Sequence, residues 1–181
     1  MIRNSASEMA SKLASGEFTS VALTQAHLDQ ISAVDKDVHA FLHVDTEGAL
    51  AQAAAVDAKR KSGEKLSPLA GVPLALKDVM TQKGIPTTCG SKILEGWRPP
   101  YDSTVVTNLK KNDIIILVRQ IWMNLQWVHP PKTQLTSTHN PWDLLASLAV
   151  QVADQLQHWL HLKHLLLLEQ ILVDLFANLQ P

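Results

Sequence analysis

Lys77 is the residue of this sequence whose type and position most directly suggest chemistry. It follows a short apolar run, residues 71–76, in an otherwise polar neighbourhood. An amine at the end of a buried strand loses hydration in its charged form, which favours the neutral amine that can accept a proton. Lys77 is therefore a candidate general base. The alternative is that its stem packs on the strand end while its ammonium stays in water.

The segment after Lys77 is rich in residues that favour tight turns, and 83–91 has the sequence KGIPTTCGS. We expect Asp78 to order this loop rather than to transfer protons. The loop also carries one thiol, Cys89, which we expect to be packed and unreactive. Its hydroxyl side chains should satisfy backbone groups in the turns, and these are Thr87, Thr88 and Ser91.

Helical and strand patterns alternate along the first 117 residues. Apolar positions three and four apart predict helices at 5–14, 20–33, 46–60 and 103–111, with Thr19 or Ser20 and Asp45 or Thr46 as N-caps. Apolar or β-branched runs predict strands at 39–44, 71–77 and 114–117. Helices that alternate with apolar strands predict an α/β fold with a covered sheet.

Composition limits the class of protein. A chain of 181 residues can bury one core, and a net charge of -1 gives no electrostatic reason to expect nucleic acid or a membrane as partner. The single Cys89 excludes an internal disulfide. Residues 1–14 have no apolar core of the kind that an export signal needs. We therefore expect a cytoplasmic protein.

The second half of the chain has a different composition. All seven glycines lie before residue 97, and leucine becomes dense after residue 144. Residues 118–137 sustain neither a helical nor a strand period, so we predict an irregular segment there. Residues 145–179 space their leucines as a helix does. Three histidines in this tail lie at i, i+3 and i+6, a spacing that drifts around a helix and does not favour a metal site.

Several motifs occur in a fixed order: GVP at 71–73, Lys77-Asp78, GIPTT at 84–88, Gly90-Ser91 and YDST at 101–104. Together they resemble the amidase signature family. The longer strings AFLHVDTEGALAQA and TTCGSKILEGWRPPYDSTV are most similar to the A subunits of the glutamyl-tRNA(Gln)/aspartyl-tRNA(Asn) amidotransferases. The resemblance runs from about residue 18 to 117.

This resemblance implies a partial amidase-signature fold, a mixed sheet covered by helices, and a Ser-cisSer-Lys triad that releases ammonia from glutamine. Lys77 matches the lysine, which would withdraw a proton through a bridging serine so that a second serine attacks the amide. The family implies the B and C subunits of the amidotransferase as partners and, through them, Glu-tRNA(Gln). ATP and magnesium belong to the partner subunit, and we expect no cofactor or metal in this chain.

The sequence departs from the family at the two serines. The family carries the bridging serine in a run resembling GGSSGGS and the nucleophile in a run resembling DTGGS, and this sequence contains neither. A displaced reading frame accounts for the difference. Codons for the family's GKTNMDEF, read one nucleotide late, translate as VRQIWMNL, the sequence of residues 118–125. Residues 139–144, HNPWDL, return to the family's frame.

A second displacement reproduces residues 146–181 from a family stretch that contains both serines. It places Gln151 over the codon of the bridging serine and Leu175 over that of the nucleophile. We therefore expect an inactive, truncated or frameshifted form. Its predicted parts are 1–117, the amidase-signature part; 118–137, an out-of-frame irregular segment; 138–144, an in-frame remnant; and 145–181, an out-of-frame, helical Leu-rich tail.

Two alternatives remain at this point. The chain could belong to an amidase-signature hydrolase of another small amide, which would share Lys77 and the turns but not the tRNA partners. It could also be a noncatalytic interaction fragment, in which 1–117 forms a scaffold and the Leu-rich tail binds a partner. The sequence leaves open whether the frame displacements are biological and whether such a chain assembles with other subunits.

Overall fold

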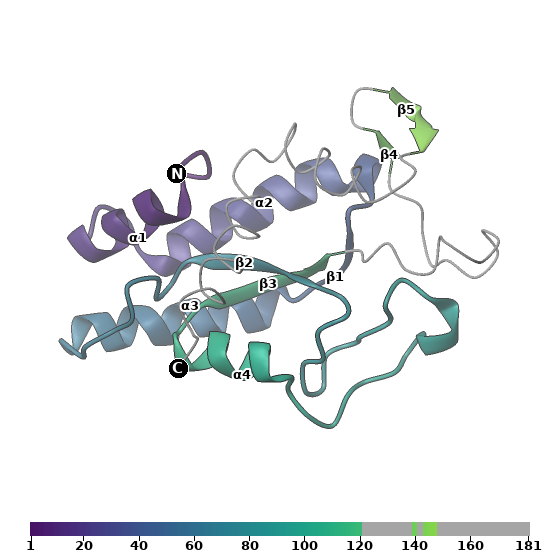
Figure 1. Ribbon diagram of the computed structural model, residues 1–181. Helices are drawn as coiled ribbons and strands as arrows, with labels where there is room; N and C mark the ends of the chain where they lie inside the picture. Colours follow the sequence, from purple (N-terminus) through teal and green to yellow (C-terminus); the bar gives the residue numbers. More distant parts are fainter. Residues whose placement is uncertain (121–138, 141–142, 148–181) are drawn as a thin grey trace.

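Three strands form the central sheet of the protein. The computed structural model describes residues 1–120, 139–140 and 143–147, with side chains for 1–120. The strands are β1 (Phe41–Val44), β2 (Pro73–Lys77) and β3 (Ile115–Gln120), and they lie in the order β1-β3-β2. The middle strand, β3, pairs antiparallel with β1 and parallel with β2 (Figure 1). The predicted α/β fold is confirmed for this part of the chain.

The helices follow the predicted periodicity closely. They are α1 (Ala6–Ser15), α2 (Ser20–Val38), α3 (Thr46–Lys61) and α4 (Thr104–Lys111), with a 3-10 turn, η1 (Lys92–Leu94). Thr19 and Asp45 are N-caps, as predicted. α2 runs five residues beyond its predicted end, because Val34 and Val38 continue the apolar spacing. The helix ends at Val38, and its C-cap, His39, has a left-handed φ of 55°.

The core lies between the sheet and helices α1, α2 and α3. α2 packs against α3, and both helices contact β3. In Figure 1, α1 and α2 run along the same side of the sheet, and the long loop after β2 extends from the end at which β2 and β3 finish. The four consecutive apolar residues of β3, Ile115 to Val118, are at most 3% exposed. A strand that is buried along its whole length explains its unbroken apolar sequence.

The start of α2 is tied to the entrance of β2. Ser20 Oγ donates a hydrogen bond to the carbonyl of Gly71 at 2.8 Å. Gly71 has a φ of 87°, and a Cβ placed there would lie 2.8 Å from Ser20 Oγ. Asp57 of α3 accepts hydrogen bonds from the backbone N–H groups of Ser20 and Val21 at 2.8 and 3.0 Å. A carboxylate from one helix therefore caps the positive end of another.

β3 is longer than the sequence pattern predicts. We predicted that it ends at Leu117 and that an irregular segment starts at residue 118, but the strand continues through Val118, Arg119 and Gln120, all of which are buried. For these three residues the prediction was wrong. Its cause is Arg119, a charged residue whose burial depends on a partner elsewhere in the chain. Residues 121–137 lie outside the described residues.

A second difference concerns the predicted Leu-rich helix. Strands β4 (His139–Asn140) and β5 (Asp143–Ser147) form a two-stranded antiparallel sheet. Residues 145–147, which we predicted to begin the helical tail, therefore belong to a strand. A short apolar stretch does not distinguish helix from strand by period alone. The remainder of the tail, 148–181, lies outside the described residues.

Candidate active site

The predicted base, Lys77, is the last residue of β2 and is half-buried. Since β2 and β3 are parallel, their carboxyl ends meet at one edge of the sheet, where Lys77 aligns with Gln120. Ligands of open α/β sheets bind at the carboxyl ends of such strands. Lys77 therefore occupies a position at which a side chain can meet a substrate.

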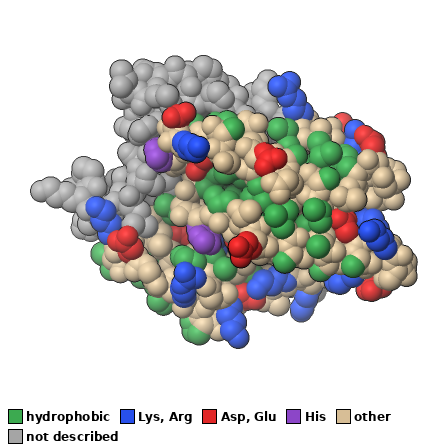
Figure 2. Space-filling view, turned by 180° about the vertical axis from the view of Figure 1, so that it is seen from behind, with side chains coloured by type: hydrophobic (Ala, Val, Ile, Leu, Met, Phe, Trp, Pro, Cys, Tyr) green, Lys and Arg blue, Asp and Glu red, His purple; other side chains and the backbone are tan. Residues whose placement is uncertain are grey.

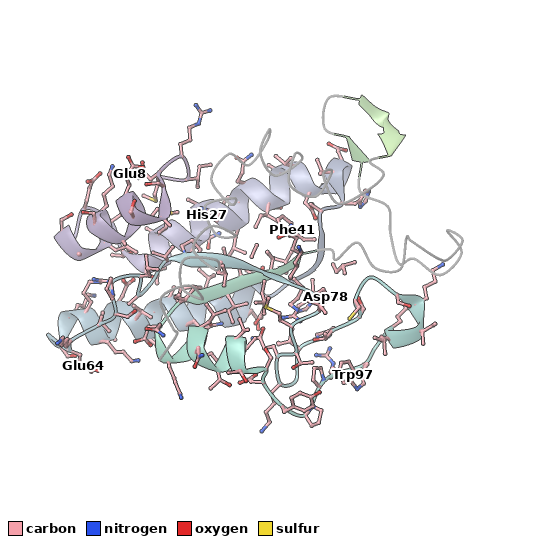
Figure 3. The ribbon with its side chains drawn as sticks, in the orientation of Figure 1. Glu8, His27, Phe41, Glu64, Asp78 and Trp97 are labelled. Carbon is pink, nitrogen blue, oxygen red and sulfur yellow. The ribbon has the colours of Figure 1, made fainter. Side chains whose placement is uncertain are left out.

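Asp78 makes polar contacts with several other segments at this edge of the sheet. Its backbone N–H donates to the carbonyl of Gln120 at 3.0 Å, which extends the strand pairing by one step. Its carboxylate accepts hydrogen bonds from the backbone N–H of Thr88 at 2.8 Å and from Thr88 Oγ1 at 2.6 Å. Figure 3 shows Asp78 just beyond the end of β2, where the long loop begins. These contacts agree with the prediction that Asp78 orders the loop.

Arg119 of β3 supplies the opposite charge. Its Nε donates to Asp78 Oδ1 at 3.2 Å, and both side chains are 1% exposed. Its Nη2 donates to the carbonyl of Met80 and, at 3.0 Å, to Thr87 Oγ1. Burial lowers the pKa of the Arg119 guanidinium, and the adjacent Asp78 carboxylate opposes this shift. Among residues 1–120, no hydrogen-bond acceptor faces Nη1.

An irregularity in β3 determines which charged side chains lie on the same face of the sheet. The pairing with β2 passes from Leu74 opposite Ile116 to Ala75 opposite Val118, so Leu117 is an additional residue in β3. Arg119 consequently aligns with Leu76. Since side chains alternate along a strand, Arg119 shares the face of Leu76 and Asp78, whereas Lys77 lies on the other face. The irregularity separates the two cations and brings Arg119 to the carboxylate.

The loop that packs on Asp78 is held by its own hydroxyl groups. Thr88 Oγ1 accepts a hydrogen bond from the N–H of Gly90 at 3.1 Å, and Ser91 Oγ accepts one from Ile93 at 3.3 Å. Thr87 Oγ1 donates to the carbonyl of Ile85 at 3.4 Å. The prediction that these hydroxyl groups satisfy the backbone is confirmed.

Cys89 lies in the same loop and has a left-handed φ of 53°. Its thiol is partly buried. Burial raises the pKa of the Cys89 thiol, the Asp78 carboxylate raises it further, and Arg119 lowers it. A thiol that holds its proton is a poor nucleophile, which agrees with the prediction of a packed, unreactive cysteine.

Of the predicted triad, the described structure contains Lys77 alone. The positions that we assigned to the displaced serine codons, Gln151 and Leu175, lie outside the described residues. Within the described residues, no group of three or more His, Cys, Asp or Glu side chains could hold a metal ion. None of the described helices is both long and apolar enough to cross a bilayer.

One face of the molecule, opposite to the one seen in Figure 1, carries mixed charges. Figure 2 shows acidic and basic side chains interspersed with apolar and uncharged ones on the face that it presents. This face has no broad patch of one sign of the kind that binds a nucleic-acid backbone.

Arg119, which the frame-displacement hypothesis assigns to out-of-frame codons, is the partner of Asp78 that our sequence reasoning missed. The sequence contained two signs of it. The predicted strand 114–117 was shorter than most strands. The next two residues are the apolar Val118 and the cation Arg119, which could complement the charge of Asp78 at the end of the neighbouring strand. The oppositely charged pair at the ends of two adjacent strands could have extended the prediction to residue 119.

Comparison with known proteins decides the family, since residues 22–148 match the family described as Amidase. The chain belongs to the amidase family. The match extends past the predicted limit of residue 117 and includes the HNPWDL segment at 139–144.

Similar amidase-family proteins include curated bacterial relatives. The chain is 59% identical over 148 residues to the A subunit of the glutamyl-tRNA(Gln) amidotransferase of Streptomyces coelicolor, an alignment that covers 80% of this chain and 29% of the relative. It is 56% identical over 144 residues to the same subunit of Salinispora arenicola, over 77% of this chain and 29% of that one. The chain thus spans less than a third of the length of these curated relatives.

Solved structures place the chain in the same amidase fold. A peptide amidase from Stenotrophomonas maltophilia aligns with a TM-score of 0.61 and 32% identity, over 65% of this chain and 24% of that one. A vestigial protein complex that bears on the evolutionary origins of an s-triazine catabolic enzyme aligns with a TM-score of 0.75 and 26% identity, over 87% of this chain and 35% of that one. The α/β core described above is therefore part of an amidase-signature fold.

Proposed function

We propose that this chain is the N-terminal part of a glutamine amidase subunit that acts in transamidation of Glu-tRNA(Gln) in the cytoplasm. In this proposal Lys77 is the base of a Ser-cisSer-Lys triad, glutamine is the substrate, and the ammonia passes to a partner subunit that uses ATP and magnesium. The B and C subunits of the amidotransferase are the proposed partners. An identity of 59% to the A subunit of a glutamyl-tRNA(Gln) amidotransferase supports this choice over other amides.

One structural observation carries the proposal. Lys77 is half-buried at the shared carboxyl edge of β2 and β3, and the following turn is fixed by the Asp78 carboxylate. A base must hold its amine in one place to receive a proton from a hydroxyl group. The strand pairing of Lys77 and the contacts of Asp78 fix the backbone that carries this amine, and this supports the proposed role.

We further propose that the 181-residue polypeptide does not hydrolyse glutamine. A lysine base without a bridging hydroxyl and a nucleophilic hydroxyl has no acyl-enzyme to form. In the frame-displacement hypothesis, Gln151 and Leu175 replace the two serines. Neither an amide nor an alkyl side chain can attack a carbonyl carbon.

Ammonia release from glutamine by the purified chain tests this proposal. We expect no turnover above that of the Lys77→Ala variant. Turnover that Lys77→Ala abolishes, and that Lys92→Ala leaves intact, would contradict the proposed inactivity. Lys92 is a suitable control because it is an exposed lysine of the same loop region.

The nucleotide sequence tests the cause of the inactivity. Correcting the reading frame at the codons for Leu117, Ser137 and Leu145 should yield the two glycine-serine runs, and the open reading frame that follows should continue the family sequence. The restored polypeptide should release ammonia from glutamine in a Lys77-dependent way. Turnover of other small amides but not of glutamine, without co-purification of a second amidotransferase subunit, would favour the hydrolase alternative.

A further inference from the structure

The Thr88 side chain is bonded to the residue that directly follows Lys77. Thr88 Oγ1 donates a hydrogen bond to Asp78 Oδ2 at 2.6 Å, and the Thr88 N–H donates to the same oxygen at 2.8 Å. The hydroxyl oxygen also accepts a hydrogen bond from the N–H of Gly90 at 3.1 Å. The proton of this hydroxyl group is therefore committed to the Asp78 carboxylate, and the group is held from both sides.

These bonds form where water has little access. Asp78 is 1% exposed and Thr88 is 8% exposed. A hydrogen bond to an ionised carboxylate is stronger than one between neutral groups, and its loss is costly where water cannot replace the donor. The Thr88 hydroxyl group is thus a strong attachment for the Asp78 side chain.

This attachment closes the segment that leaves the carboxyl edge of the sheet. Asp78 and Thr88 lie 10 positions apart in the sequence, and the carbonyl of Lys77 accepts a hydrogen bond from the N–H of Met80 at 3.1 Å. Since Lys77 and Asp78 share a peptide bond, freedom gained by Asp78 reaches the backbone that carries the Lys77 amine. Side chains alternate along a strand, so the attachment lies on the face opposite Lys77.

The contact between Thr88 and Asp78 does not depend on Arg119. Arg119 Nε donates to Asp78 Oδ1, which is the other oxygen of the carboxylate. Lys77, Asp78 and Thr88 all lie before residue 118, in the KD and GIPTT motifs that carry the resemblance to the amidase family. A polypeptide with the restored reading frame would therefore keep all three residues.

We propose that Thr88 is a positioning residue for Lys77. Its hydroxyl group holds the Asp78 carboxylate, and Asp78 in turn fixes the backbone from which the Lys77 amine extends at the carboxyl edge of the sheet. Because its hydroxyl proton is donated to Asp78, Thr88 acts through Asp78 and does not itself exchange protons with a substrate. This inference rests on the proposed function only for the role of Lys77 as a base.

General stabilisation of the fold is the competing explanation for the contacts of Thr88. Two half-buried lysines distinguish the two roles, because they lie at opposite ends of the sheet. Lys77 ends β2, whereas Lys59 forms an ion pair of 2.6 Å with Asp113, just before β3 begins. A general loss of stability exposes both amines, but loss of a positioning contact exposes that of Lys77 alone.

Competitive acetylation of the full chain measures both amines without any need for turnover. Trace isotope-coded acetic anhydride labels the lysines of the folded protein, and peptide mass spectrometry gives the rates at Lys77 and Lys59 relative to the exposed Lys92. Thr88→Val keeps the shape of the side chain and removes the hydroxyl group. It should raise the rate at Lys77 by roughly three- to tenfold, because local opening exposes the amine, and leave the rate at Lys59 unchanged.

Two matched substitutions serve as controls. Thr88→Ser keeps the donor to Asp78 and the acceptor for Gly90, and it should keep the wild-type rate at Lys77. Thr46→Val makes the same chemical change at an exposed position at the start of α3, and it should leave both rates as in the wild type. If Thr88→Val does not fold, Thr88→Ala, which places no methyl group against the carboxylate, is measured instead.

A wild-type rate at Lys77 in the folded variant overturns the inference. An equal rise at Lys77 and Lys59 also overturns it, because it identifies a general loss of stability. A rate in Thr88→Ser that matches the raised rate of Thr88→Val would contradict it as well, since the hydroxyl group would then not be the cause. None of these results depends on ammonia release, so the inference and the proposed function fail separately.

Discussion

Arg119 of β3 aligns with Leu76 of β2, one residue away from Lys77. Without the additional residue at Leu117, continuation of the pairing from Pro73 opposite Ile115 would align Lys77 with Arg119. Two cations would then share one face of the sheet, and Asp78 would lose its counter-charge. The irregularity in β3 is therefore part of the site, because it assigns one cation to the carboxylate and leaves the other at the open edge.

The cap that α3 provides for α2 predicts a stability effect. Asp57→Ala removes the acceptor for the backbone N–H groups of Ser20 and Val21, and we expect the free energy of unfolding to fall by about 1–2 kcal/mol. Urea titration followed by circular dichroism measures the change. Asp37→Ala, at an exposed position of the same fold, is the control and should be close to neutral. Equal effects of the two substitutions would contradict the assignment of the cap.

Much of this architecture could be predicted from the sequence. Apolar spacing located the four α-helices of residues 1–120, and the residues at Thr19 and Asp45 marked two of their starts. These features depend on neighbours within one or two turns of the chain. The cap by Asp57 could not be predicted in the same way, because Asp57 lies 36 or 37 positions along the sequence from the residues whose N–H groups donate to its carboxylate.

The same difference between local and distant contacts applies to the candidate site. Lys77 and Asp78 could be identified from the sequence because they lie at the end of a predicted apolar strand. Arg119 did not, because the sheet pairing and the irregularity at Leu117 determine its burial and its partner, which lies 41 positions away. Pairing between distant segments has no local signature, so a charged residue after an apolar run appeared to end the strand.

Gly71 provides a second prediction, with Gly63 as a matched control. Both residues have left-handed φ values, 87° and 78°, but an added Cβ at Gly63 meets nothing within 4 Å. Gly63→Ala should therefore cost only backbone strain, about 1 kcal/mol. Gly71→Ala should cost a further ~1–3 kcal/mol, because its Cβ would press on Ser20. Thermal unfolding measures the two effects. Equal decreases in the midpoint temperatures of the two variants would contradict this geometry.

The Cys89 thiol offers a test of the charges around Asp78. Its pKa is raised above the ordinary value of 9.0, by burial first and by Asp78 second. Asp78→Asn should lower the pKa of the thiol, since a neutral amide no longer opposes the thiolate. The pH dependence of the rate of alkylation by iodoacetamide measures it. Asp37→Asn should leave that profile in place, and an unchanged profile in Asp78→Asn would refute the coupling.

The sign of this shift also sets a stability trend. The folded protein holds the Cys89 proton more tightly than the unfolded chain does, so the stabilisation is complete below the unfolded pKa. It is lost as the pH rises through the higher folded value. We expect Cys89→Ala to weaken the decline in unfolding free energy at alkaline pH, as measured by urea titration from neutral pH upwards.

Asp35 predicts a trend in the acidic range. Burial raises the pKa of its carboxyl above 3.8, although hydrogen bonds from Ala40 and Phe41 oppose the shift. The protonated form is thus favoured in the folded state, and this contribution to stability disappears as the pH rises from about 4 through the folded pKa. Asp35→Asn keeps an acceptor for the Ala40 N–H, at 2.6 Å in the wild type, and removes this cost.

We therefore expect Asp35→Asn to match or exceed the wild-type unfolding free energy at pH 7, because the neutral amide carries no charge that burial disfavours. Its stability should also change less than that of the wild type as the pH rises through the folded pKa of Asp35, which burial raises above 3.8. Asp37→Asn, on the exposed side of the same helix, is the control. A variant that loses stability at pH 7 and keeps the wild-type pH trend would speak against this account.

The order β1-β3-β2 has a consequence for the time at which the protein can fold. β1 and β2 do not pair with each other in this sheet, since β3 lies between them, and β3 comes last of the three along the chain. A nascent polypeptide that has not yet exposed Gln120 beyond the ribosome holds two strands with no partner. Sheet formation must wait for the third, and with it arrives the arginine that neutralises Asp78.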